Sequence, residues 1–154
     1  MTTSKQTGFA DLLTTLDKTL TEYLVDKAPA LPTNIKELIV KLTPWLTLIF
    51  LILALPALLF LFGLGSFLTP LAFLGGAGEG TAYIITMVFS LIVVILEAMA
   101  IPGLFNRTRT GWMYLFYATL IGGVQNIVTF NIGGLIIGTL LSLYLLYQVK
   151  TYYK

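Results

Sequence analysis

The sequence predicts an all-α fold: an integral membrane four-transmembrane-helix bundle with an N-terminal cytoplasmic amphipathic helix. Two observations predict it. Residues 42–78 and 110–149 contain no Asp, Glu, Lys or Arg, and an apolar run covers 83–101 between them. The chain is 57% hydrophobic and only 10% charged, against roughly 25% charged residues in soluble domains. Because ionised side chains and unpaired backbone groups are costly in hydrocarbon, such stretches favour membrane-spanning helices.

The first element is an amphipathic helix within residues 9–27. Its apolar positions recur at helical spacing, at Phe9, Leu12, Leu13, Leu16, Leu20, Tyr23 and Leu24. The opposite face carries Asp11, Asp17, Lys18, Glu22, Asp26 and Lys27 and is net acidic. Helices that adsorb to membranes are usually rich in Lys and Arg. We therefore expect residues 9–27 to dock on protein: the chain's own bundle, a second copy in a homo-oligomer, or another membrane or cytoplasmic protein. A plain surface helix is the alternative.

A proline-containing linker, residues 28–32, ends this helix because proline lacks a backbone donor. Asn34 and Glu37 have the spacing of a capping box, which predicts a second short helix. Pro44 and Trp45 then mark where the membrane begins. We divide the chain into an N-terminal cytoplasmic or interfacial helical region, residues 1–43, and a transmembrane domain, residues 44–154.

Four spans are expected at approximately 45–62, 82–101, 112–128 and 132–149. The first has 18 residues, or about 27 Å of helix, enough for the hydrocarbon layer. Pro56 should kink it. The apolar piece 67–74 is too short to cross and is either interfacial or re-entrant. Pro102 and Gly103 are expected to end the second span, and a hairpin near Asn131 must separate the third and fourth.

Basic residues set the expected orientation, with both ends of the chain in the cytoplasm. This arrangement places Lys36, Lys41, Arg107, Arg109, Lys150 and Lys154 inside and leaves both external connections without Lys or Arg. Arg107 and Arg109 are therefore topology determinants, and they can also hold a lipid headgroup. The expected location is a cytoplasmic (inner) membrane, with the lipid bilayer as a partner.

Glu97 is the one ionisable residue inside the predicted spans. Intramembrane ionisable residues are functional candidates by default. The sequence leaves two interpretations open. Glu97 is either an anchor near the cytoplasmic end that reaches water or pairs with Arg107 or Arg109, or a group that takes part in binding or transport.

Small residues recur every four positions in the last two spans. These are Ala118 and Gly122 in the third span and Gly134, Gly138 and Ser142 in the fourth. Such spacing lets helix backbones approach closely in lipid. It predicts packing of the third span on the fourth, with dimerisation through the fourth as the alternative.

Several functions are excluded on composition. The chain has no Cys and no His, and no Asp follows Asp26, so Ser-His, cysteine and intramembrane aspartyl catalysis lack their residues. We expect no enzyme activity, no catalytic residue, no cofactor and no metal. The net charge of +2 without a basic cluster argues against nucleic acid.

The run Arg107–Tyr117, RTRTGWMYLFY, resembles a basic loop and third-helix start found in small, uncharacterised bacterial four-helix (multi-pass) membrane proteins. Their acidic N-terminal helix and proline linker are similar to residues 9–34. The resemblance implies a bacterial membrane setting and, since that group has no assigned activity, transfers no site residue. We expect a non-enzymatic accessory or structural subunit; the alternative is a small oligomeric transporter or channel that uses Glu97.

Overall fold

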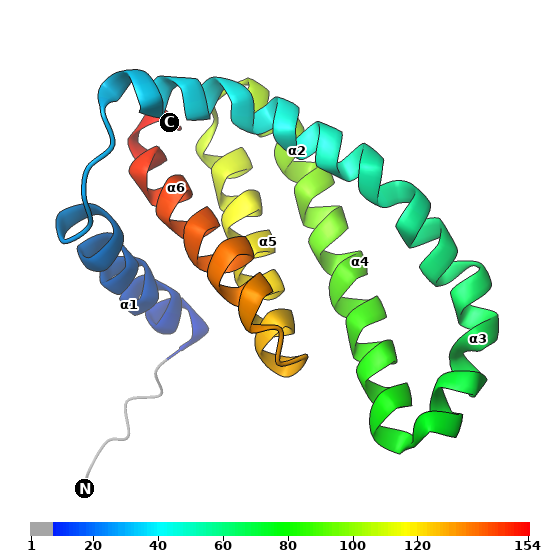
Figure 1. Ribbon diagram of the computed structural model, residues 1–154. Coiled ribbons are helices and arrows are strands. Elements are labelled where there is room, and N and C mark those ends of the chain that lie inside the picture. The colour runs from blue at the N-terminus through cyan, green and yellow to red at the C-terminus, as the bar shows by residue number, and fades with distance from the viewer. Residues whose placement is uncertain (1–7) are drawn as a thin grey trace, which may run out of the picture.

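The computed structural model describes residues 8–154, apart from the side chains of residues 66, 68, 69, 72, 77 and 79 (Figure 1). The described part is all-α, 87% helical and without strands. Its elements are α1 (Phe9–Thr21), the π-helix η1 (Glu22–Asp26), α2 (Thr33–Phe62), α3 (Leu64–Ala72), the 3-10 turn η2 (Phe73–Gly75), α4 (Ala77–Phe105), α5 (Arg109–Val128), the π-helix η3 (Gly134–Leu141), α6 (Ser142–Gln148) and the 3-10 turn η4 (Lys150–Tyr152). The all-α prediction is confirmed.

Helices α2 and α4 form a long hairpin closed by α3 and η2 at its far tip (Figure 1). The chain reverses at Gly76, whose φ of +120° is a conformation that glycine adopts without strain. The segment 67–74, expected to be interfacial or re-entrant, lies within α3 and η2 at this tip. The hydroxyl of Tyr83 in α4 donates a hydrogen bond to the carbonyl of Leu61, which ties the two arms together there.

Helix α2 corrects two expectations about the N-terminal half. It runs without a break from Thr33 to Phe62 and contains Pro44 and Pro56, so the separate short helix ahead of Pro44 is wrong. Pro32 occupies the N-cap and no side chain caps the helix, so the capping box is wrong as well. A proline removes one backbone hydrogen bond, and the long apolar helix around it continues despite that loss.

Helix α4 continues through Pro102 to Phe105, so the expected end at Pro102–Gly103 is also wrong. The eight residues that follow Glu97, up to Phe105, correspond to about 12 Å of helix. Glu97 therefore lies about two turns inside α4 rather than at its end.

The buried core is concentrated where the α4–α5 loop, the C-terminus and the first turns of α2 meet. Trp112 is its centre: the indole stacks on Phe116 at 5.2 Å between ring centroids and meets Tyr147 edge-on at 5.6 Å. The Trp112 Nε1 donates a 2.9 Å hydrogen bond to the carbonyl of Leu146, which joins α5 to α6. Val40 of α2 and Leu104 of α4 complete this core at 1% exposure each.

Helices α4 and α5 cross most closely at Gly103 and Gly111. A Cβ on Gly103 would lie 2.5 Å from the Cα of Gly111, which is closer than real Cβ contacts. Only glycine permits this approach on either helix. The crossing fixes the α4–α5 corner beside the Trp112 core.

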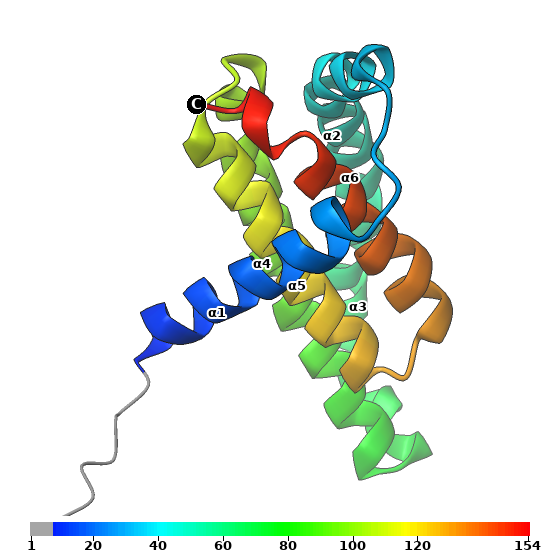
Figure 2. The same ribbon diagram turned by 90° about the vertical axis from the view of Figure 1, so that its left-hand side faces the viewer.

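The N-terminal segment docks on α5 and α6 of its own chain (Figures 1 and 2). Asp17 accepts hydrogen bonds from the Tyr147 hydroxyl at 2.6 Å and from the Lys150 ammonium at 2.7 Å. Gln148 donates to the carbonyl of Leu24 and accepts from the amide of Leu31. The expected docking of residues 9–27 is seen within the chain only for the later part of the segment, since Phe9, Leu12 and Leu16 of the apolar face are 76%, 57% and 38% exposed. Docking to a second protein stays a prediction.

By length and composition, α2 and the part of α4 from Gly80 to Phe105 can each cross a membrane. Only 6% of the apolar window of each is buried within the protein. Helix α5 has 20 residues but carries the polar Gln125 and Asn126. The fourth expected span corresponds to a shorter apolar helix, Gly134–Gln148. Two helices of the described residues can therefore each cross a membrane, and four crossings stay a prediction.

We predict that Gly111→Ala destabilises the protein by about 1–3 kcal/mol, because its methyl would lie 2.5 Å from the backbone nitrogen of Leu104. Gly122→Ala is the matched control in the same helix. A methyl at Gly122 meets nothing within 4 Å, and alanine has the higher helix propensity. Thermal unfolding in detergent, followed by circular dichroism, should show a lower Tm for Gly111→Ala alone. Equal melting temperatures would contradict the close crossing.

We also predict that docking of α1 depends on pH through Asp17. Burial by itself raises the pKa of the Asp17 carboxyl, but the hydrogen bonds from Lys150 and Tyr147 and the charges of Lys150 and Arg109 outweigh it and hold the pKa below its ordinary value. A lowered carboxyl pKa stabilises docking above the ordinary pKa of about 4, and that contribution is lost as the pH falls further. Because Asp17 is partly exposed, we expect about 1 kcal/mol or less.

The chain's lack of Cys allows spin labels to be placed at Lys18→Cys and Thr110→Cys. Electron paramagnetic resonance should give a narrow distance distribution at pH 7 that broadens near pH 3. Asp17→Asn should broaden it already at pH 7, with up to about fivefold more undocked protein. Asp26→Asn, an exposed acid in η1, serves as the control. No difference between the two variants would rule out the Asp17 contact as the anchor.

Candidate functional site

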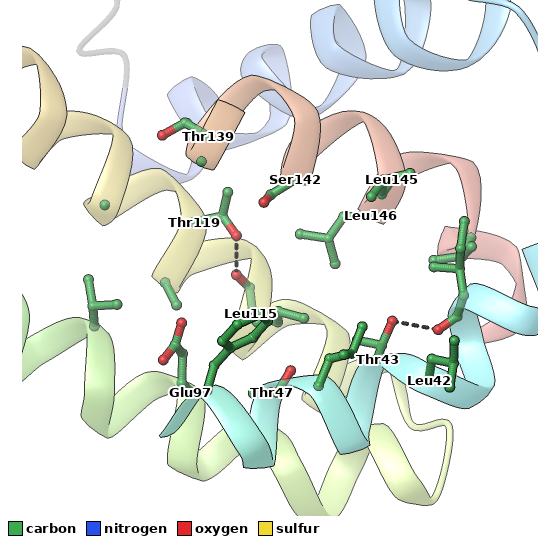
Figure 3. A pocket seen from close by; sticks show the side chains of 18 of the residues that line it. Leu42, Thr43, Thr47, Glu97, Leu115, Thr119, Thr139, Ser142, Leu145 and Leu146 are labelled. Carbon is green, nitrogen blue, oxygen red and sulfur yellow. Dashed lines mark hydrogen bonds between the residues drawn. The ribbon is translucent and has the colours of Figure 1, made fainter. Parts of the chain in front are cut away.

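A cavity of about 430 Å³ lies between α2 on one side and α5, η3 and α6 on the other, with α4 at its floor (Figure 3). This volume is within the range of small-molecule sites, roughly 300–1,000 Å³. The lining residues come from α2, α4, α5, η3 and α6 and the residue that follows α6. They are Leu38, Ile39, Leu42, Thr43, Leu46, Thr47, Phe50, Val93, Glu97, Leu115, Ala118, Thr119, Gly122, Asn126, Gly138, Thr139, Ser142, Leu145, Leu146 and Val149. Most of these side chains are apolar.

Glu97 is the one ionisable side chain in that lining. Its carboxylate points from α4 into the cavity, near Thr47 of α2 and Leu115 of α5 (Figure 3). The ion pairs within residues 8–154 are Lys27–Glu22 and Lys150–Asp17, so Glu97 is not paired with Arg107 or Arg109. The arginine pairing considered for the anchor is therefore absent, and a role of Glu97 in binding or transport stays a prediction.

Two threonine hydroxyls of the lining donate within their own helices: Thr119 lies on the same side of the cavity as Glu97, and Thr43 lies toward the other side (Figure 3). Thr43 donates its hydrogen to the carbonyl of Ile39 at 2.7 Å, and Thr119 donates to the carbonyl of Leu115 at 2.8 Å. A hydroxyl that donates within its own helix turns its lone pairs toward the site. The cavity therefore combines one carboxylate with several acceptor oxygens, and its lining contains no Lys or Arg.

The structure brings most of the sequence-predicted candidates together. Five of them line the cavity: Glu97, Ala118, Gly122, Gly138 and Ser142. A methyl on Gly122 or Gly138 would meet nothing within 4 Å, so these two glycines leave space open. The close α5–η3 contact is made next to them, where a Cβ on Gly123 would lie 2.7 Å from Thr139.

Three candidates lie elsewhere. Gly134 sits against Asn126 and Asn131 at the hairpin between α5 and η3, where the Asn131 side chain accepts from the Gly134 amide. Arg107 and Arg109 are exposed at the α4–α5 corner. Their backbone groups pair with the last residue of the chain: the Arg109 amide donates to the Lys154 carbonyl, and the Lys154 amide donates to the Arg107 carbonyl.

Sequence reasoning missed the threonines of the site. Thr43 and Thr47 are four residues apart, the spacing of one helix face, and this was the available signal. Thr139 lies in the π-helix η3, and no pattern in the sequence predicts a π-helix there. π-Helical segments are rare and often occur at functional sites.

The arrangement offers charge and hydrogen-bond acceptors for binding. Within residues 8–154, no group of three or more His, Cys, Asp or Glu is placed to hold a metal ion. Asn126 of α5 donates a 3.4 Å hydrogen bond to the hydroxyl of Thr139 in η3, and both residues line the cavity.

Comparison with protein families, curated proteins and solved structures finds no match for this chain. The resemblance to small bacterial four-helix membrane proteins stays an expectation. The functional argument therefore depends on the geometry of the cavity.

Proposed function

We propose that this chain is a multi-pass integral membrane protein that binds a small molecule in the cavity beside Glu97. It crosses the bilayer four times, with both ends in the cytoplasm. In support, α2 and α4 carry long apolar faces that the protein itself leaves exposed. A core helix of a water-soluble protein hides such a face, whereas a lipid-facing helix does not.

The arrangement of the ends supports this topology. The start of α2, the α4–α5 loop and the C-terminus lie at one end of the molecule, and both the α3–η2 tip and the α5–η3 turn lie toward the other (Figure 1). The basic residues Lys36, Lys41, Arg107, Arg109 and Lys150 belong to the first end. An excess of Lys and Arg marks the cytoplasmic side.

The observation that carries the binding function is the carboxylate of Glu97, which faces a cavity without a cationic partner. A carboxylate at this depth is costly unless something compensates it. A ligand that completes the site supplies that compensation. Transport of the ligand, in a small oligomeric assembly, is the extended form of this proposal.

The accessory-subunit role expected from the sequence has less support. It was based on the missing catalytic residues, the small residues at close-packing spacing and the acidic N-terminal helix. In the structure Asp17 and Gln148 already tie this segment to α6 and the C-terminal turn. We retain the non-enzymatic character of the protein and place its activity in the cavity.

The topology predicts opposite labelling of two single cysteines. Phe130→Cys lies in the α5–η3 turn, where Phe130 is 89% exposed, and should react with a membrane-impermeant maleimide added to intact cells. Lys154→Cys at the C-terminus should react only after the cells are permeabilised. The reverse pattern, or labelling of both from outside, would refute the four-crossing arrangement.

The binding site predicts unequal reactivity of two neighbouring positions. Ser142→Cys lines the cavity, whereas Leu141→Cys is on the exposed apolar side of η3. Thiols react as thiolates, which form in water and not in lipid. In liposomes, N-ethylmaleimide should modify Ser142→Cys about tenfold or more faster. Equal, slow labelling would mean that small molecules do not reach the cavity, and the proposed binding function would fall.

A further inference from the structure

The charge of the cavity limits the chemical class of its occupant. Glu97 supplies a negative charge, and the hydroxyl of Thr119, which donates within its own helix, keeps its lone pairs free to accept. The lining includes no Lys or Arg that would balance the carboxylate. An anion would be repelled by the carboxylate. A neutral apolar molecule would leave Glu97 either as an unpaired charge or as a protonated acid, whereas a cation pairs with the carboxylate directly.

The apolar walls limit the class further. Leu46 and Phe50 of α2 and Leu145 of α6 line the same cavity as Glu97. A hydrated inorganic cation gains nothing from such walls, since hard cations are held by several oxygen ligands, and one carboxylate with scattered hydroxyls does not make a cage. A proton alone does not need a volume of about 430 Å³.

The cavity also opens sideways. Phe50 on α2 is 63% exposed and Leu46 is 46% exposed, and Gly138 on the facing helix is exposed too, although all three line the cavity. Gly138 has no side chain, and a Cβ there would meet nothing within 4 Å, so this position leaves the side of the cavity open. If α2 and η3 lie in lipid, an amphiphile can enter from the bilayer at this point.

From these observations we propose that the cavity binds a lipophilic organic monocation, such as an ammonium or phosphonium ion with apolar substituents. The charged centre pairs with Glu97, and the substituents lie along Leu46, Phe50 and α6. This inference rests on the binding function proposed above and specifies the ligand class of that same site.

The test uses the full-length chain in phosphatidylcholine nanodiscs and three probes of similar shape but different charge: tetraphenylphosphonium, neutral triphenylphosphine oxide and anionic tetraphenylborate. Equilibrium dialysis against empty nanodiscs removes the contribution of lipid partitioning. We expect saturable binding of tetraphenylphosphonium that is at least about tenfold tighter than binding of either other probe.

The variants connect this preference to the cavity. Glu97→Gln should weaken tetraphenylphosphonium binding by about tenfold or more, while Glu97→Asp, which keeps the charge, should retain most of it. Glu37→Gln removes an exposed acid of α2 outside the cavity lining and should change nothing. Gly138→Phe fills the lateral opening and should abolish binding, whereas Ile137→Phe on the neighbouring exposed position should not.

The outcomes separate the two proposals. Equal binding of cation and neutral probe that Gly138→Phe abolishes would overturn the cation inference and leave the binding function standing. Stronger binding of tetraphenylborate, or unchanged binding in Glu97→Gln, would also overturn the inference. If tetraphenylphosphonium does not bind, the inference falls, and the labelling of Ser142→Cys decides whether the binding function falls with it.

Discussion

The hydrogen bond from the Trp112 indole to the carbonyl of Leu146 closes one end of this molecule. Around it, stacked and edge-on rings of Phe116 and Tyr147 join α5 to α6, and the Gly103–Gly111 crossing brings α4 to the same place. Aromatic pairs add about 0.5–1.5 kcal/mol each beyond the area they bury. The cavity begins at this core, since Leu146 and Val149 belong to both, and it lies where α2 stands apart from η3 and α6.

The position of Glu97 follows from that geometry. Where α2 and η3 are held apart, a carboxylate on α4 faces open space instead of a packed neighbour. A filled interior at this level would impose the full cost of a buried, unpaired charge. Glycine at positions 122 and 138 keeps the volume open, since a side chain at either position would extend into it. The same small residues that predict close packing in the sequence therefore serve, at these two positions, to leave room.

Much of the fold is readable from residue patterns because it depends on local apolar periodicity and on where charges are absent. Helical segments, the linker at 28–32 and the hairpin near Asn131 were predicted on this basis, as was the candidate Glu97. Continuation of α2 through Pro44 and of α4 through Pro102 was not, since one lost hydrogen bond is decided by the packing around it. The spacing of Thr43 and Thr47 places them on one helix face, but that they share a cavity with Thr119 and Thr139 follows only from the packing of several helices.

Helix α6 contacts both the cavity and the N-terminal segment. Ser142 and Leu145 face the cavity, while Tyr147 and Gln148 hold the N-terminal segment through Asp17 and the carbonyl of Leu24. Helix α6 has only seven residues, so the residues that line the cavity and those that hold the N-terminal segment are close together on it. We therefore expect a shift of the N-terminal segment to move this wall of the cavity. The N-terminal segment is thus attached to the helix that lines the cavity, through Asp17, whereas Asp11, Lys18 and Glu22 of its charged face stay exposed.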